Sequence, residues 1–175
     1  LSTMDTDYKG ELMIDGQRMT NLKVDSLAAI RNEKIGFVFQ FHHLLAEFTA
    51  IENVCIPAFI KGRSRIEAEN EAKKILDFLN LSDRIEHKPG QLSGGEQQRV
   101  AVARALINNP SVILADEPSG NLDSVNKKEL HELFFKLRDK YNQTFIIVTH
   151  DNGLAEMSDR VLRIKDGVIV NDAGN

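Results

Sequence analysis

The chain has 175 residues, 42% hydrophobic and 27% charged, a formal net charge of −4 at pH 7 and a pI of about 5.8. This length suits one domain with a buried core, and the slightly acidic balance excludes the basic footprint expected of a nucleic-acid-binding protein. A single cysteine, no apolar run near the ~20 residues of a membrane span and no signal-peptide pattern predict a soluble, intracellular protein.

The first part of the chain is expected to form short elements around one buried strand. ELMIDG (11–16) alternates in polarity and ends in a turn signal, so it predicts a short strand, and residues 25–32 predict a short helix. The compact apolar run IGFVFQ (35–40) predicts a buried strand. A loop over 41–48 is expected to follow.

Two predicted helices come next, and each begins with the residue spacing of a capping box. Thr49 with Glu52, and Ser64 with Glu67, have the spacing that satisfies free N–H groups at a helix start. The second helix is expected to carry its apolar residues on one face: Ile66, Ala72, Ile75, Leu76 and Leu79. Residues of about 49–90 therefore predict a small helical insert, in which Cys55 is expected to be a buried small residue rather than a reactive thiol.

The second half alternates between strands and helices. After a helix that begins near Ser93 and stops at Pro110, the nearly unbroken apolar run SVILADE predicts a parallel strand covered on both faces. This strand covers residues 111–117, and the further expected elements are an amphipathic helix over 124–140, a second buried strand over 144–150, a short helix over 152–157 and a hairpin over 160–170 turned at 165–167. This order predicts an α/β fold with a parallel sheet that carries a helical subdomain.

Two adjacent glycines, Gly94 and Gly95, stand at the start of the helix in LSGGEQQRVAVARAL (92–106). Each glycine costs about 1 kcal/mol relative to alanine inside a helix, so their presence needs a reason. One reason is mechanical: Ser93 caps the helix and the glycines turn the chain. The other is chemical, because a serine and bare N–H groups at a helix start can bind phosphate.

Polar side chains stand at the ends of all three strands that are expected to be buried. Gln40 ends the first strand, Asp116 and Glu117 the second, and Thr149 with His150 the third. Ligands of open α/β sheets lie at the carboxyl ends of the strands, where these groups suit Mg²⁺ binding, activation of water and contact with phosphate. Taken singly, the two acids could merely end a strand, and His150 could be a structural histidine.

The order of the motifs resembles the nucleotide-binding subunit of ABC transporters. LSGGEQQRVAVARAL resembles the family signature, ILADEP its Walker B strand, SGNLD (119–123) its D-loop and VTHD its H-loop. The resemblance implies a P-loop NTPase-like core in one ATP-binding domain over 1–175, with a helical subdomain at about 49–108. FQFHHLLAEFTAIENV (39–54) is most similar to the lipoprotein-releasing group, although macrolide exporters and a cell-division ATPase share much of it.

The resemblance assigns roles around the sheet edge. Asp116 is expected to bind Mg²⁺ through water and Glu117 to act as the general base. Gln40 is expected to contact Mg²⁺ and the attacking water while sensing the membrane partner. His150 is expected to donate a hydrogen bond to the γ-phosphate of ATP.

The resemblance also implies that the chain works as a homodimer with two ATP molecules sandwiched between the protomers. Ser93 and Gly95 are expected to bind the γ-phosphate of the ATP that the other protomer holds, and Gly94, Gln98 and Asp123 to complete this nucleotide contact across the interface. Integral-membrane subunits are expected to dock near the Q-loop and the helical subdomain, which places the protein peripherally on the cytoplasmic face of the membrane. No nucleic-acid partner is expected.

One part of the family pattern is missing. The sequence contains no G-x-x-x-x-G-K-[ST] loop to cradle the phosphates, and the resemblance places that loop just ahead of Leu1. The 175 residues thus resemble about the last four-fifths of the domain. Because the remaining motifs are intact, we expect that the N-terminal portion with this loop is missing from the sequence, rather than that the protein has lost it. The alternatives to a transport ATPase are a non-catalytic dimerising scaffold and an ABC ATPase of cell division or DNA maintenance.

Overall fold

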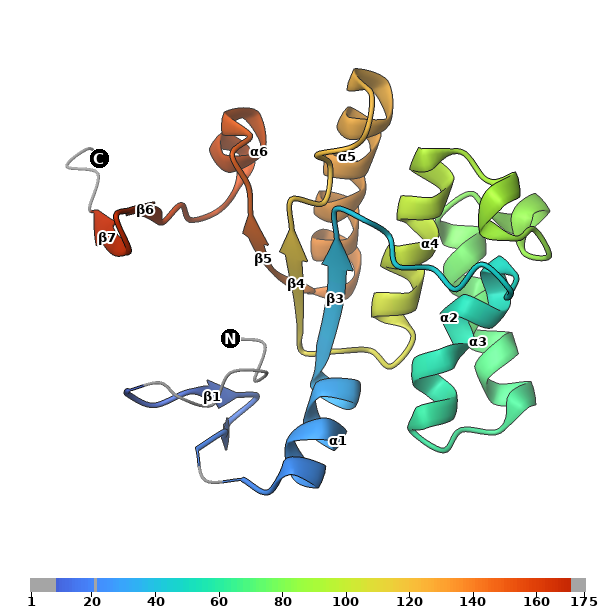
Figure 1. Ribbon diagram of the computed structural model, residues 1–175, viewed down its shortest axis with the longest axis horizontal. Coiled ribbons are helices and arrows are strands. Elements are labelled where there is room, and N and C mark those ends of the chain that lie inside the picture. Colours follow the sequence, from blue (N-terminus) through green and yellow to red (C-terminus); the bar gives the residue numbers. More distant parts are fainter. Residues whose placement is uncertain (1–8, 21, 171–175) are drawn as a thin grey trace.

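The centre of the molecule is a parallel sheet of three strands, seen in a computed structural model that describes residues 9–20 and 22–170 (Figure 1). The strands are β3 (Ile35–Phe39), β4 (Val112–Asp116) and β5 (Thr144–Val148), in the order β3-β4-β5. Phe39 pairs with Asp116, and Asp116 pairs with Val148, so the three strands end level with one another. The predicted α/β fold with a parallel sheet is confirmed.

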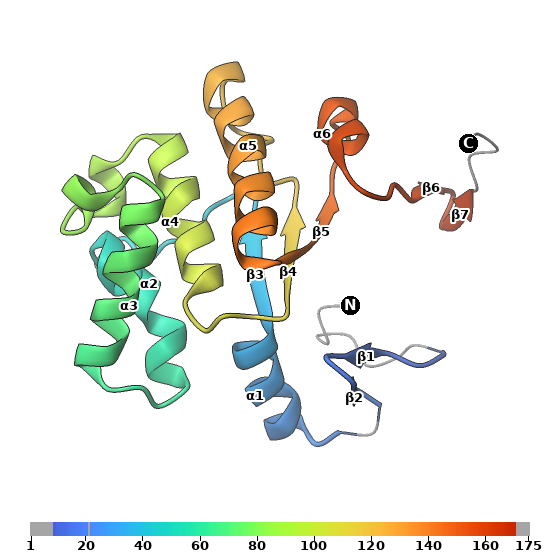
Figure 2. The same cartoon turned by 180° about the vertical axis from the view of Figure 1, so that it is seen from behind.

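Helices cover one face of this sheet. Figure 2 shows α5 (Ser124–Tyr141) lying across it, with α4 (Gly94–Leu106) alongside. Val38, Ile113 and Ala115 point from the strands into the main core that these helices complete. A side chain at Gly36 would place its Cβ 2.7 Å from the carbonyl oxygen of Ala105, so this glycine lets α4 lie directly against β3.

A second group of helices packs on the far side of α4. It consists of α2 (Ala50–Ile60) and α3 (Arg65–Phe78), followed by 3-10 turns at Ser82–Arg84 and Pro89–Gln91. Both predicted capping boxes are present, and each serine or threonine accepts a hydrogen bond from the backbone of its glutamate. Cys55 is buried as expected, and burial raises the pKa of its thiol to about 11, so the thiol stays protonated.

The remaining elements flank the sheet. They are β1 (Met13–Ile14), β2 (Gln17–Arg18), α1 (Val24–Lys34), α6 (Asn152–Met157), β6 (Arg163–Lys165) and β7 (Val168–Val170). The predicted C-terminal hairpin is confirmed, with its turn at Asp166 and Gly167, both at positive φ. None of the helices in the described ranges has the length and apolar character needed to cross a membrane.

The short strand expected over 11–16 is β1, and the expected turn at its end is formed by Asp15 and Gly16, whose φ values of 52° and 74° lead the chain back into β2. Two predictions about the fold are wrong in detail. Ile66, expected on the buried face of α3, is 74% exposed, because it lies two residues before the buried Ala68 and thus about 200° around the helix from it.

The strand expected to be buried over 144–150 is the second correction. β5 stops at Val148 and is the edge of the described sheet, so only Phe145 and Ile147 pack on the core. Ile146 and Val148 alternate onto the opposite face, and Val148 is 62% exposed. That face, which Figure 1 shows toward the viewer, carries a second core cluster, in which Ile30 of α1, Ile14 of β1 and Met19 pack with Ile35 of β3. Phe37, Val112 and Leu114 pack against this cluster.

Candidate active site at the carboxyl edge of the sheet

Glu117 directly follows β4, and its side chain forms hydrogen bonds with the segment that follows β5. Its Oε1 accepts a hydrogen bond from the backbone N–H of His150 at 2.9 Å and lies 2.8 Å from His150 Nδ1. Its Oε2 accepts a hydrogen bond from the Thr149 hydroxyl at 3.2 Å. A carboxylate only accepts, so Nδ1 carries a proton and Nε2 is the ring nitrogen left for a ligand. The structure thus brings together two of the predicted site residues.

The backbone of Glu117 is strained. Its φ is +43°, a left-handed conformation that costs a non-glycine residue about 1–3 kcal/mol and concentrates at functional sites. Two hydrogen bonds hold it: the Glu117 N–H donates to the Val148 carbonyl at 2.9 Å, and the Glu117 carbonyl accepts from the Gly120 N–H at 3.0 Å. This turn presents the carboxylate to the end of β5. The sequence carried no signal for it.

Gln40 is fixed by the segment after Glu117. Its Nε2 donates to Asn121 Oδ1 at 2.9 Å, and Asn121 Nδ2 donates to the Gln40 carbonyl at 3.4 Å. A side chain at Gly120 would come within 2.8 Å of Gln40 Nε2, so the glycine leaves room for this amide. The bond occupies the NH₂ group, which leaves Oε1 as the atom suited to a cation.

The donor set at this edge fits a hydrated Mg²⁺. Asp116 ends β4 with an exposed side chain, and the β3–β4 register sets it opposite Phe39, one residue before Gln40. In the described part of the chain, no group of three or more His, Cys, Asp or Glu is arranged to hold a metal alone. Mg²⁺ needs only one or two carboxylates and keeps waters and phosphate oxygens as its other ligands. Asp116 with Gln40 Oε1 meets that requirement.

Ser93 caps α4 as the mechanical interpretation predicts. Ser93 Oγ accepts the Glu96 N–H at 3.2 Å, and Glu96 Oε2 accepts the Ser93 N–H at 2.7 Å. This backbone hydrogen bond is the main cause that lowers the pKa of Glu96, aided by Arg84, whose Nε lies 2.9 Å from Oε1. The Ser93 side chain also contributes a hydrogen bond that lowers the pKa of Glu96, so the hydroxyl both accepts from the Glu96 backbone and faces its carboxylate.

The two glycines of the signature differ in what surrounds them. A Cβ on Gly95 would lie 2.7 Å from Asn126 Cγ, whereas a Cβ on Gly94 would meet only Leu122 Cδ2 at 3.8 Å. Gly95 is therefore required for the contact between α4 and α5, which corrects the expectation that phosphate approach alone explains it. Gly94 has the open surface that a ligand needs.

The structure corrects the expectation that Gln98 contacts the nucleotide. Its side chain is completely buried, and Nε2 donates to the carbonyls of Pro118 at 2.7 Å and Phe39 at 3.3 Å. In this conformation the amide has no surface to offer a nucleotide.

Asp123 is the N-cap of α5. Its Oδ1 accepts the backbone N–H groups of Val125 and Asn126, both at 3.0 Å, and Oδ2 accepts Asn126 Nδ2 at 2.5 Å. The hydrogen bond from the Asn126 backbone is the main cause that lowers the pKa of Asp123. The carboxylate is therefore ionised and fixed in direction at the start of α5.

Arg104 is a residue of this region that the sequence interpretation missed. From α4 it donates through Nη1 to the His43 carbonyl at 2.7 Å and through Nη2 to the His42 carbonyl at 2.8 Å. Burial lowers the pKa of Arg104. A charged residue within the apolar run VAVARAL was the available signal. Arg104 ties the loop after Gln40 to the helix that begins at Ser93.

An ion pair links α5 to the segment after His150. Lys127 on α5 pairs with Asp151, which also caps α6 by accepting the Leu154 N–H at 2.9 Å. The Lys127 side chain is the main cause that lowers the pKa of Asp151 from 3.8 to about 2. Because the folded pKa lies below the unfolded one, this stabilisation is complete above about pH 4 and is lost as the pH falls toward 2.

We expect Lys127→Met to lower the free energy of unfolding by about 1 kcal/mol at pH 7, since the pair is partly exposed and screened by solvent. The difference from the wild type should shrink as the pH falls from about 4 to 2. Urea unfolding at several pH values measures it, with the exposed neighbour Lys128→Met as the control. A difference that does not change with pH would assign the loss to packing of the lysine stem.

A family model described as "ABC transporter" matches residues 1–120. The curated "Lipoprotein-releasing system ATP-binding protein LolD" of Bacteroides thetaiotaomicron is 59% identical over 172 residues, which cover 98% of this chain and 79% of that protein. The protein of the same name from Porphyromonas gingivalis is 56% identical over 172 residues, 98% of this chain and 78% of that one.

Solved structures agree with these sequence matches. A dimeric structure of MJ0796, described as a bacterial ABC transporter cassette, aligns with a TM-score of 0.84 at 42% identity and covers 97% of this chain and 75% of that one. A dimeric post-hydrolysis state of the cassette MJ0796 bound to ADP and Pi aligns with a TM-score of 0.84 at 41% identity and the same coverage. The chain belongs to the ABC transporter family.

Proposed function

We propose that this chain is the ATP-binding and ATP-hydrolysing subunit of a transporter that releases lipoproteins from the membrane. The observation that carries the proposal is the Glu117 carboxylate held against His150, at the sheet edge where Asp116 and Gln40 end their strands. The 59% identity to a lipoprotein-releasing ATP-binding protein supports the cargo class. The whole chain is one ATP-binding domain with a helical subdomain at about 49–108.

The roles proposed for the side chains follow from their chemistry. Mg²⁺ bound together with ATP would neutralise charge on the phosphates, and Asp116 and the Gln40 oxygen are the groups to hold it. Glu117 takes the proton of the attacking water as general base. His150 donates through Nδ1 to Glu117, and it would donate to the γ-phosphate through Nε2 as the imidazolium ion, in which both ring nitrogens carry protons. Thr149 and the two N–H contacts of His150 keep the Glu117 carboxylate in place.

The other half of each site is proposed to come from a second copy of the chain. Ser93 stands at the first turn of α4, and Gly94 leaves the start of this helix open, which suits an anion at a helix N-terminus. Asp123, fixed at the start of α5, faces the same interface. The dimeric cassettes that the chain resembles support this pairing.

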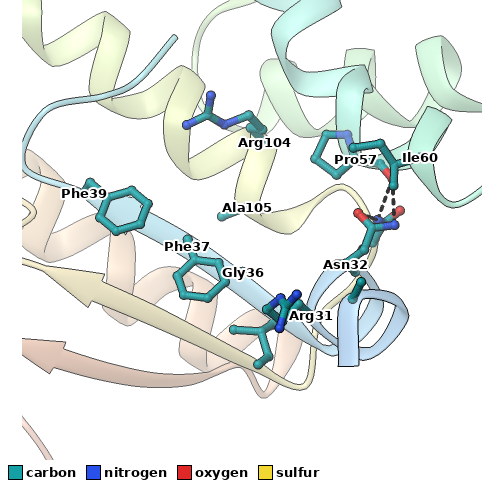
Figure 3. A pocket seen from close by; sticks show the side chains of 12 residues that line it. Arg31, Asn32, Gly36, Phe37, Phe39, Pro57, Ile60, Arg104 and Ala105 are labelled. Carbon is teal, nitrogen blue, oxygen red and sulfur yellow. Dashed lines mark hydrogen bonds between the residues drawn. The ribbon is translucent and has the colours of Figure 1, made fainter. Parts of the chain in front are cut away.

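A groove beside β3 is the proposed docking place for the membrane subunits. It has a volume of about 410 Å³ and lies between α1, β3, α2 and α4 (Figure 3). Phe37, Phe39, Pro57 and Ile60 give it apolar walls, and Arg104 adds a cation beside the loop after Gln40. Asn32 Nδ2 braces one wall by donating to the Pro57 carbonyl at 3.1 Å. This docking places the protein peripherally on the cytoplasmic face of the membrane.

We expect Ile60→Asp to abolish most of the stimulation of ATP hydrolysis by the membrane subunits and to leave basal hydrolysis by the full-length protein unchanged. Ile60 is 71% exposed and lines the groove, so a charge there opposes an apolar partner without disturbing the core. Ile66→Asp on α3 is the matched control, because Ile66 is equally exposed outside the groove. The measurement is ATPase rate in the reconstituted complex; equal loss in both variants would contradict docking at the groove, and no hydrolysis by the wild type would contradict the proposed function.

A further inference from the structure

Gln98 is a buried amide with an unusual position between the two main parts of the molecule. It lies on α4, five residues after Ser93, and none of its surface is exposed. Its NH₂ group donates to the Pro118 carbonyl at 2.7 Å and to the Phe39 carbonyl at 3.3 Å. Because both partners are acceptors, the NH₂ group must face them. The amide orientation is thus determined by its partners.

The two carbonyls belong to residues next to the proposed catalytic groups in the sequence. The Phe39 carbonyl forms the peptide bond to Gln40, and Pro118 is the residue directly after Glu117. One side chain therefore connects the signature helix both to the end of β3 and to the strained turn after β4. No other side chain in the described ranges is recorded with hydrogen bonds to both of these segments.

We infer that Gln98 is a positioning residue that sets Gln40 and Glu117 according to where the signature helix lies. When Ser93 and Gly94 engage a nucleotide on the partner protomer, α4 moves as a rigid element and carries the amide with it. The amide pulls on both carbonyls, so Gln40 and Glu117 reach their working positions together. The inference rests on the proposed function. It adds how nucleotide binding at Ser93 and Gly94 changes the positions of Gln40 and Glu117 in the same protomer.

The unpaired oxygen of the same amide supports a role that depends on position. Gln98 Oε1 is buried and accepts no hydrogen bond from the described residues. An unsatisfied buried acceptor is destabilising; methionine would remove it but would leave the Phe39 and Pro118 carbonyls without the hydrogen bonds that Gln98 donates. Glutamine can donate hydrogen bonds to both carbonyls and so hold the two segments, whereas methionine has no donor.

The test compares Gln98→Met with Gln143→Met in the full-length protein. Gln143 is also a buried glutamine, and its Nε2 donates to the Pro110 carbonyl at 3.1 Å, at the opposite end of the sheet. We expect Gln98→Met to lower kcat about 10-fold or more with little change in the KM for ATP, because small misplacement of catalytic groups is costly. Gln143→Met should lose similar thermal stability and keep kcat.

Hydrogen exchange gives a readout that does not need hydrolysis. Without nucleotide, Gln98→Met should speed amide exchange in residues 39–41 and 118–122, and Gln143→Met should leave both segments as in the wild type. Equal losses of kcat in the two variants, or unchanged exchange in both segments of Gln98→Met, would overturn the inference. A wild type without ATPase activity would remove the proposed function and leave the exchange comparison valid.

Gln98→Asn keeps the test available if Gln98→Met does not fold. Asparagine retains the buried amide but is one methylene shorter, so it cannot span the distance to both carbonyls. We expect faster exchange in one of the two segments and an intermediate kcat. Wild-type kcat and exchange in Gln98→Asn would contradict a role for the double contact.

Discussion

Replacement of Glu117 by glutamine is expected to slow ATP hydrolysis by the full-length protein at least ~10²-fold, the scale of a lost general base. Glutamine has the same shape and keeps an oxygen that accepts the His150 N–H at the position of Oε1. It cannot take a proton from water, so binding of ATP should persist while turnover stops. Steady-state ATPase rates and nucleotide affinity, measured on the same protein, separate the two steps.

Glu156→Gln is the matched control for this change. Glu156 is an exposed carboxylate on the nearby helix α6, so its replacement removes the same charge without touching the sheet edge. We expect the wild-type rate in this variant. Normal turnover in Glu117→Gln would remove Glu117 from the role of base, and loss of ATP binding in that variant would show that its carboxylate serves the architecture of the site.

Gly95→Ala is expected to destabilise the protein by about 1–3 kcal/mol, the range for overpacking a close contact, and to prevent ATP-dependent pairing of protomers. The added Cβ would lie 2.7 Å from Asn126 Cγ, and Asn126 in turn bonds Asp123 Oδ2 at 2.5 Å. The methyl group thus displaces the start of α5 as well as α4. Thermal unfolding and sedimentation with ATP measure the two effects.

Two further variants distinguish a steric role of Gly95 from a ligand role. In Gly95→Ala combined with Asn126→Ala, the obstructing amide is gone, so stability should recover. Gly94→Ala meets only Leu122 Cδ2 at 3.8 Å and should be as stable as the wild type. Lost pairing in a stable Gly94→Ala would identify Gly94 as the glycine that nucleotide approaches. Unrecovered stability in the double variant would contradict the clash with Asn126.

Features determined by neighbouring residues could be predicted from the sequence. The capping boxes at Thr49 and Ser64 depend on a pair three residues apart, and both are present. The parallel strands β3 and β4 follow from compact apolar runs, and their ends place Gln40 beside Asp116. Local spacing and the rule that ligands lie at the carboxyl ends of strands were sufficient for these.

Features determined by tertiary packing could not be predicted. Burial of Gln98 depends on the backbone carbonyls of two strand ends, 59 and 20 residues away in sequence. The exposure of Val148 depends on which strands lie beside β5, and the steric need for Gly95 depends on Asn126 of another helix. The left-handed backbone of Glu117 is imposed by its bonds to Val148 and Gly120.

Two copies of this chain are expected to close on ATP, after which Glu117 acts as general base in its hydrolysis. Sedimentation velocity of full-length Glu117→Gln, with and without Mg²⁺ and ATP, tests this claim most directly. We expect a monomer without nucleotide and a stable dimer with Mg²⁺ and ATP. The additional change Ser93→Ala should prevent the dimer while ATP still binds each protomer. A protein that binds ATP and stays monomeric at every concentration would contradict the paired site.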